Sequence, residues 1–183
     1  MSSQTRTETD SLGSVEIPAN AYWGVHTARA HENFPIARRP ISVYPDFVRA
    51  FACVKQAAAR ANLEIGALDE QRATLIDRAC EEIKTGMLHD QFVVGVVQGG
   101  AGTSTNMNAN EVITNRALEL AGRPKGDYAF INPNDHTNHS QSTNDTYPTA
   151  IKIALAFSLR SLLDELELLA DSFAAKGREF ANI

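Results

Sequence analysis

The sequence is poor in cysteine and has no long apolar run, and each absence excludes a class of protein. Only Cys53 and Cys80 occur among the 183 residues. Both lie in stretches with helical periodicity, so we expect buried free thiols rather than a disulfide. No apolar run approaches the roughly 20 residues of a membrane-spanning helix. The polar N-terminal segment MSSQTRTETDSLG lacks the apolar core of a secretion signal. These absences predict a cytoplasmic protein that has no membrane partner.

The sequence also lacks an excess of basic over acidic residues. The formal net charge is −5 at pH 7, and no cluster of lysines and arginines offsets it locally, so nucleic acid is not an expected partner. The same charge would steer an anionic ligand weakly or adversely, so an anion site must rely on local groups. With 43% hydrophobic and 21% charged residues, the composition is that of an ordinary globular domain, with length left for the start of another.

Apolar periodicity predicts a mainly α-helical chain with a small β and loop segment near its N-terminus. We expect residues 1–10 to be disordered and residues 11–34 to form a short strand or hairpin and a loop. Helices should run from Pro45 to Gly66, from an N-cap at Asp69 to Gly86, and over residues 106–121. Residues 92–97 fit either a strand or a buried loop. The first helix should bury Phe47, Phe51, Val54, Ala58, Ala61 and Ile65. The second should bury Leu75, Ile76, Ala79, Cys80 and Ile83.

The longest apolar pattern lies near the C-terminal end, after Pro148. Its members follow one another at spacings of 4, 3, 4, 3 and 4: Leu155, Leu159, Leu162, Leu166, Leu169 and Phe173. This is a heptad-like seam on a helix of some thirty residues, about 45 Å long. A small domain cannot cover such a seam, so we expect a helical bundle partner. We therefore predict a helical domain over residues 11–146 and the start of a bundle over residues 147–183, with the chain forming the N-terminal piece of a longer protein.

Two polar segments give the strongest indication of function. Residues 98–116 read QGGAGTSTNMNANEVITNR, and residues 132–150 read NPNDHTNHSQSTNDTYPTA. Each combines hydroxyls and side-chain amides, the first also contains glycines, and each leads into a predicted helix. The start of a helix offers unpaired N–H groups and a partial positive charge, which suit a carboxylate. We predict a site that holds a small di-acid through neutral donors.

The first polar segment is not a nucleotide loop. No lysine occurs between Lys84 and Lys125, so the Gly-Lys-Ser/Thr of a phosphate-binding loop is missing. A dinucleotide fingerprint would need a third glycine where Thr105 stands. A glycine-rich turn with a Thr or Asn cap remains the alternative to a ligand loop. The density of short polar side chains, which weaken a helix unless they are used, favours the ligand loop.

The second polar segment offers two further alternatives, which we consider weaker. Asp135, His136 and His139 lie too close together in one loop to supply a complete metal site, so we expect no metal. A serine hydrolase is not indicated, because the G-x-S-x-G motif is absent. Here Asp145 and Thr146 are expected to cap the following helix, whereas residues 142–144 should face the ligand.

Outside these segments one further side chain is a candidate. Arg29, in the N-terminal segment, is a candidate to bind a substrate carboxylate through two parallel hydrogen bonds. Glu111, Asn115 and Arg116 are interpreted as polar groups with a structural role.

The same motifs carry a resemblance to the aspartase/fumarase superfamily. It extends over residues 10–183 and rests on LGSVEIPANAYWGVHTARAHENF, GGAGTSTNMNANEV, KGDYAFINPNDHTN and SQSTNDTYPT. Fumarate hydratases typically have GSG where this chain has residues 100–102. They also have SSND where it has residues 142–145, and His-Pro-Asn-Asp where it has residues 132–135. These differences favour the branch that deaminates aspartate, with a hydratase-type lyase as the alternative.

The resemblance implies specific roles. Thr103, Ser142 and Thr143 would surround the β-carboxylate of the substrate, and Asn144 would lie beside the leaving amino group. Weaker candidates are Arg29, Ser104 and His136. The implied reaction is the reversible deamination of L-aspartate to fumarate and ammonia through an aci-carboxylate, without a cofactor.

The resemblance also implies an assembly. It predicts an N-terminal helical domain followed by the first long helix of a central bundle, and a homotetramer in which three subunits build each site. The catalytic serine base of this family belongs to a loop that follows these motifs. We therefore expect no catalytic residue in this chain and no activity from it alone; as it stands, it could act only in binding or assembly.

Overall fold

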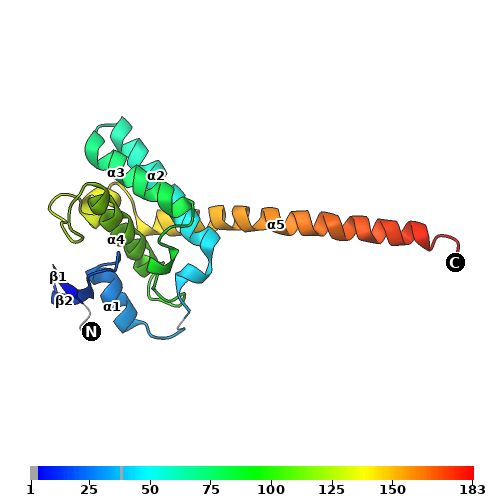
Figure 1. Ribbon diagram of the computed structural model, residues 1–183, viewed down its shortest axis with the longest axis horizontal. Coiled ribbons are helices and arrows are strands. Elements are labelled where there is room, and N and C mark those ends of the chain that lie inside the picture. Colours follow the sequence, from blue (N-terminus) through cyan, green and yellow to red (C-terminus); the bar gives the residue numbers. More distant parts are fainter. Residues whose placement is uncertain (1–3, 38) are drawn as a thin grey trace.

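The computed structural model describes residues 4–37 and 39–183, and it is mainly α-helical, as expected (Figure 1). Two strands, β1 (Thr5–Asp10) and β2 (Gly13–Pro18), precede helices α1 (Val25–Asn33), α2 (Pro45–Glu64), α3 (Glu70–Lys84), α4 (Thr103–Leu120) and α5 (Thr143–Glu179). Short 3₁₀ turns span Ile41–Val43 and His89–Gln91, and a π-type turn spans Pro133–Thr137. Helices α1 to α4 cluster at one end of the molecule, and α5 projects from the cluster (Figure 1).

The prediction of disorder is wrong for residues 5–10, which form β1; residues 1–3 lie outside the described residues. β1 pairs antiparallel with β2, with Thr5 opposite Pro18 and Asp10 opposite Gly13. Hydrogen bonds, rather than burial of apolar side chains, hold this strand against the following segment. The Arg6 guanidinium donates to the carbonyl oxygens of residues 18, 21 and 23 at 2.7 to 3.0 Å. A hydropathy pattern does not reveal such bonds, so the strand resembled a disordered tail.

Helices α2, α3 and α4 form the core. All five predicted core residues of α3 are buried, and the Asp69 side chain caps α3 by accepting from Arg72 N at 3.0 Å. The predicted face of α2 is partly wrong, since Ile65 is 74% exposed and Ala61 is exposed. The face that α2 does bury includes polar residues: Val48, Ala50, Phe51, Ala52, Lys55, Gln56, Ala59 and Asn62. Residues 92–97 form a loop with one isolated bridge, between Pro40 and Gly95.

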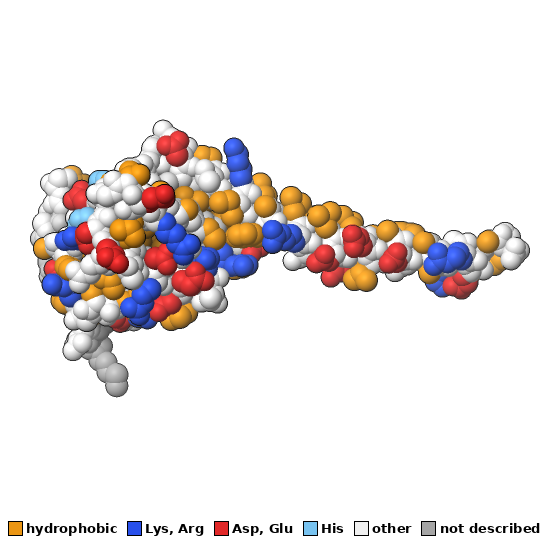
Figure 2. Space-filling view, turned by 90° about the horizontal axis from the view of Figure 1, so that it is seen from above, with side chains coloured by type: hydrophobic (Ala, Val, Ile, Leu, Met, Phe, Trp, Pro, Cys, Tyr) orange, Lys and Arg blue, Asp and Glu red, His pale blue; other side chains and the backbone are white. Residues whose placement is uncertain are grey.

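The last helix begins at Thr143, earlier than predicted, with Pro148 inside it. Ala150 and Ala154 are buried in its first turns, where α5 packs on α2. Farther along, the predicted seam is open: Leu155, Leu159, Leu162, Leu166, Leu169 and Phe173 are 49% to 71% exposed. Hydrophobic side chains accordingly show along the projecting part of α5 in Figure 2. The partner expected for this seam stays a prediction. Among the described residues no helix is long and apolar enough to cross a membrane.

Two buried carboxylates satisfy the N-terminus of α1, which no side chain caps at Gly24. Glu111 on α4 is fully buried and accepts from the backbone N–H groups of Gly24, His26 and Thr27 at 2.8 to 3.1 Å. Glu8 on β1 accepts from Val25 N at 2.9 Å. The first N–H groups of a helix have no partner within it, and its dipole favours negative charge there. These contacts give Glu111 the structural role that the sequence indicated.

Replacing Glu111 with glutamine should destabilise the fold. The amide would turn an NH₂ group toward backbone donors and remove a charge from the start of α1, at a cost of about 2–3 kcal/mol. The free energy of unfolding from urea titration measures this loss. Glu64→Gln, at an exposed position on α2, is the matched control and should stay within about 0.5 kcal/mol of the parent. An equal effect of both variants would contradict the capping role.

Arg29 fastens the hairpin to α1. Its guanidinium donates to both carboxylate oxygens of Asp10, at 2.6 and 2.7 Å, and to Gly13 O at 3.1 Å. The hydrogen bond from Arg29 lowers the pKa of Asp10 from 3.8 to about 2. Because the folded value lies below the unfolded one, this pair stabilises the fold above pH 3.8, and the effect disappears as the pH falls through about 2.

Asp10→Asn should therefore lower the urea midpoint at pH 6, and the difference from the parent should shrink as the pH approaches 2. Urea titrations across this pH range provide the measurement. Asp164→Asn, at an exposed position on α5, serves as control and should show no comparable convergence. A constant difference at all pH values would show that the ion pair does not contribute in this way.

Candidate functional site

The fold joins the two polar segments at the starts of α4 and α5. Asn106, in the first turn of α4, donates from Nδ2 to Thr143 Oγ1 at 3.2 Å and accepts at Oδ1 from Thr146 Oγ1 at 3.1 Å. Thr103 lies three residues before Asn106, so the two are neighbours on the helix surface. Thr103 begins α4 and Thr143 begins α5, and Asn106 links these two helix starts; a shared site for Thr103 and Thr143 stays a prediction.

The glycine-rich loop can lie against α5 because Gly102 has no side chain. A Cβ atom at Gly102 would overlap the ring of Tyr147, and its φ of +84° favours glycine. Tyr147 in turn packs edge-on against Phe47 and Phe51 of α2, with ring centroids 5.5 and 6.0 Å apart. Aromatic packing on α2 therefore fixes how closely the loop approaches α5.

A cavity of about 370 Å³ opens between this loop and α5. Its wall consists of Val96, Gln98, Gly100, Ala101, Gly102, Asn144, Tyr147 and Pro148. The Thr103 hydroxyl lies near this wall, 3.6 Å from where a Cβ atom on Gly100 would stand. No side chain caps α4 at Gly102, although Gln98 Oε1 accepts from Thr105 N at 2.9 Å. The cavity therefore faces the start of α4, where Gln98 occupies one N–H group, and the first turn of α5.

Ser142 rather than Asp145 or Thr146 caps α5, which corrects the sequence interpretation. Ser142 Oγ accepts from Asn144 N at 3.2 Å, while Thr146 is buried and bonds to Asn106. The reason is the start of the helix at Thr143, which makes Ser142 the flanking residue. In the described part of the chain, neither Ser142 nor Thr143 donates its hydroxyl hydrogen to another protein group. Both hydrogens are available to a ligand.

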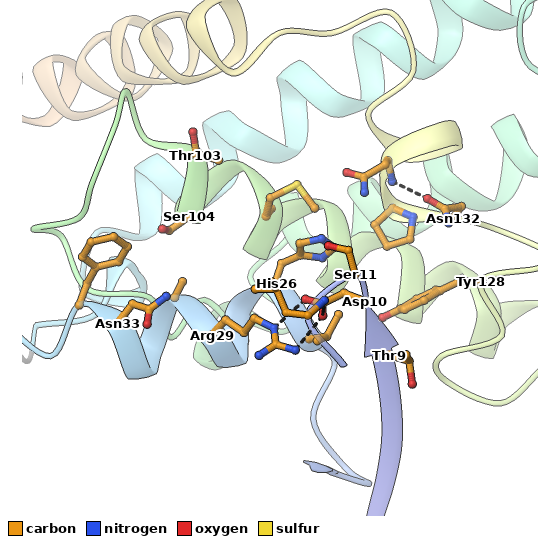
Figure 3. A pocket seen from close by; sticks show the side chains of 17 residues that line it. Thr9, Asp10, Ser11, His26, Arg29, Asn33, Thr103, Ser104, Tyr128 and Asn132 are labelled. Carbon is orange, nitrogen blue, oxygen red and sulfur yellow. Dashed lines mark hydrogen bonds and ion pairs between the residues drawn. The ribbon is translucent and has the colours of Figure 1, made fainter. Parts of the chain in front are cut away.

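A second, larger cavity of about 570 Å³ lies on the side of the hairpin and α1 (Figure 3). Thr103, Ser104, His26 and Arg29 contribute to its wall. The Arg29 guanidinium is occupied by Asp10, and Figure 3 shows the Thr103 side chain pointing away from it. Thr103, Ser104 and Arg29 line this larger cavity, whereas Asn144 lines the smaller one, so the structure does not bring Thr103 and Asn144 into one cavity.

His136 has a local structural contact. Its Nδ1 accepts from Asn132 N at 2.8 Å inside the turn Pro133–Thr137. Burial, and then the nearby guanidinium of Arg72, lower the pKa of His136 below its ordinary value, which suits a neutral acceptor ring. His136 lines neither of these two cavities. The described residues also contain no group of three or more His, Cys, Asp or Glu side chains able to hold a metal ion.

Sequence reasoning missed one residue of this junction, Lys55. It is fully buried on α2 and donates from Nζ to Asn106 Oδ1 at 2.6 Å and to Asn138 Oδ1 and Gln141 Oε1 at 2.9 Å each. The available signal was its position four residues after Phe51 and four before Ala59, on the face that α2 buries. A lysine at such a position calls for buried acceptors.

The comparisons with known proteins agree with this architecture. Residues 13–183 match a protein-family model described as lyase. An aspartate ammonia-lyase from Pseudomonas fluorescens is 52% identical over 97% of this chain and 37% of its own length. A crystal structure described as fumarate lyase:delta crystallin from Brucella melitensis has 54% identity and a TM-score of 0.96, covering 98% of this chain and 42% of that one.

A class II fumarase from Schistosoma mansoni is more distant, with 35% identity and a TM-score of 0.77 over 84% of this chain and 32% of its own. The chain thus spans well under half the length of the relatives it matches. Match length, identity and fold agree, and the chain belongs to the lyase family of the aspartase/fumarase superfamily.

Proposed function

We propose that this chain is the N-terminal portion of a lyase that reversibly deaminates L-aspartate to fumarate and ammonia. The observation that carries the proposal is the meeting of the α4 and α5 starts at Asn106, where Thr143 keeps a free hydroxyl hydrogen. The identity of 52% to an aspartate ammonia-lyase, against 35% to a class II fumarase, favours an amine over water as the leaving group.

The chemistry explains why neutral donors suit this site. Removal of a proton from the carbon beside the β-carboxylate drives the electron pair into that carboxylate and gives a doubly charged aci-carboxylate. The pair then returns to form the carbon–carbon double bond, and the C–N bond breaks to release the amine. Donors aimed at the carboxylate oxygens bind this intermediate more strongly than the substrate. Each such donor can lower the barrier by about 3 kcal/mol.

In the proposed site, four side chains contact the substrate. Thr103, Ser142 and Thr143 donate to the β-carboxylate, and Asn144 lies beside the leaving amino group. Arg29, Ser104 and His136 remain weaker candidates; of these, Arg29 is already paired with Asp10 and His136 with Asn132. The base that removes the proton belongs to a serine loop outside this chain, so the chain needs other parts of the protein to act.

Assembly completes the proposed site. The exposed apolar seam of α5 is suited to a helical bundle, and we place residues 147–183 at the start of that bundle. A homotetramer would cover the seam and bring together residues from three subunits. The setting is proposed to be cytoplasmic, with aspartate and fumarate as small-molecule partners.

The proposal predicts that the full-length protein forms fumarate from aspartate much faster than from malate. Fumarate absorbs in the ultraviolet, so both reactions can be followed in one assay with purified protein. Activity on malate without activity on aspartate would instead support the hydratase-type alternative, for which the 35% identity to a class II fumarase is the supporting observation.

Thr143→Val should lower kcat by one to two orders of magnitude or more, because it removes one donor from the developing charge while conserving shape. Thr149→Val is the matched control, because Thr149 is an exposed threonine on the same helix. It should retain near-parental turnover. Circular dichroism of both variants should match the parent. A near-normal rate for Thr143→Val would count against its role at the carboxylate.

A further inference from the structure

Lys55 is a buried lysine that no carboxylate contacts among the described residues. Its side chain is fully buried, and in the described part of the chain it forms no ion pair with a carboxylate. The titratable group that faces it, Cys80 on α3, has a pKa raised by burial and stays a neutral thiol. Burial lowers the pKa of Lys55 to about 7. Such a charge is costly to keep inside a protein unless specific groups receive it.

The groups that receive it are three side-chain amides. Asn106 on α4, Asn138 and Gln141 each present an oxygen to Nζ, at 2.6, 2.9 and 2.9 Å. Three acceptors match the three N–H bonds of an ammonium group, whereas a neutral amine would turn a lone pair toward one of the oxygens. The geometry therefore selects the charged form, against the effect of burial.

Lys55 also determines which way the Asn106 amide faces. An ammonium group can only donate, so the Asn106 atom beside it must be Oδ1. The Nδ2 atom then faces the other way and donates to Asn138 Oδ1 at 3.1 Å and Thr143 Oγ1 at 3.2 Å. With Thr146 bonded to Oδ1, all four hydrogen-bonding positions of this amide are filled.

The orientation of Asn106 fixes the role of the Thr143 hydroxyl. Because Thr143 Oγ1 receives a hydrogen from Asn106, its own hydrogen is left to donate outward. Hydrogen bonds in a chain polarise one another, so an ammonium at one end makes the hydroxyl at the other end a stronger donor. If the Asn106 amide were reversed, the Thr143 hydroxyl would donate to the amide oxygen. A substrate carboxylate would then face a lone pair of Thr143 Oγ1 instead of a hydrogen.

We propose that Lys55 is a positioning residue for the elimination, acting through Asn106 to hold Thr143 as a donor toward the substrate carboxylate. The inference rests on the proposed function, since it takes Thr143 as a ligand of that carboxylate. The positive charge reaches the site through the amide without contacting the substrate. Its influence is greatest when the carboxylate gains its second negative charge, so it acts on turnover more than on binding.

The test is a mutant cycle in the full-length protein, assayed by fumarate formation. Lys55→Met approximately conserves the length of the side chain and removes its positive charge. We expect kcat to fall about a hundredfold while KM for aspartate changes less than about threefold. In a Thr143→Val background the same substitution should have almost no further effect, because the group it acts through is gone. Lys84→Met is the matched control, since Lys84 also donates to an amide oxygen of α2, Gln56 Oε1 at 3.0 Å.

A second variant covers the case in which Lys55→Met does not fold. Asn106→Asp keeps the size of the side chain and pairs with Lys55, but it has no N–H to give to Thr143. It should fold and lose turnover to the extent that Thr143→Val does, with a similar KM.

The outcomes separate the two proposals. Parental kcat in Lys55→Met or Asn106→Asp, or losses that add fully to that of Thr143→Val, would overturn the positioning role while the proposed function stands. A near-parental rate in Thr143→Val alone would remove the carboxylate role itself, and the inference with it.

Discussion

The four hydrogen bonds of Asn106 are the interaction on which the candidate site depends. They join α4 to Lys55 on α2, to Asn138 in the preceding segment, and to Thr143 and Thr146 at the start of α5. A buried amide that loses one partner costs about 1–3 kcal/mol. The starts of α4 and α5 are therefore held in one relative placement, and the site takes its rigidity from the core rather than from its loops.

The helix starts differ in the charge of the side chains that accept from their N–H groups. At the start of α1, the buried carboxylates Glu111 and Glu8 occupy the N–H groups, so that helix end is closed to an external anion. At the start of α4 the only side-chain acceptor among the described residues is the neutral amide of Gln98, on Thr105 N, and α5 has the neutral cap Ser142. Because the net charge of these 183 residues is −5, the proposed attraction for a di-acid would come from these two helix starts and from the charge of Lys55 behind them.

The projecting helix links assembly to this site. The first turn of α5 contains Thr143 and Asn144, while its later turns expose an apolar seam whose residues are 49% to 71% exposed. One continuous helix therefore carries the proposed ligand groups at one end and, in the described part of the chain, an exposed apolar surface along the rest. Burying that surface would fix the axis of α5, and with it the direction in which the proposed ligand groups of its first turn point.

The sequence by itself determined the helical class, the cap at Asp69, the core face of α3, the exposed seam of α5 and the polar segments that form the candidate site. These follow from local periodicity and capping chemistry, which act over a few residues. Tertiary structure decided the rest. Strand β1 is held by the Arg6 guanidinium, Ser142 caps α5 because the helix starts at Thr143, and Lys55 is buried because amides distant in the sequence receive its charge. Hydrogen bonds between such distant polar groups leave no period in the sequence, so only the folded chain reveals them.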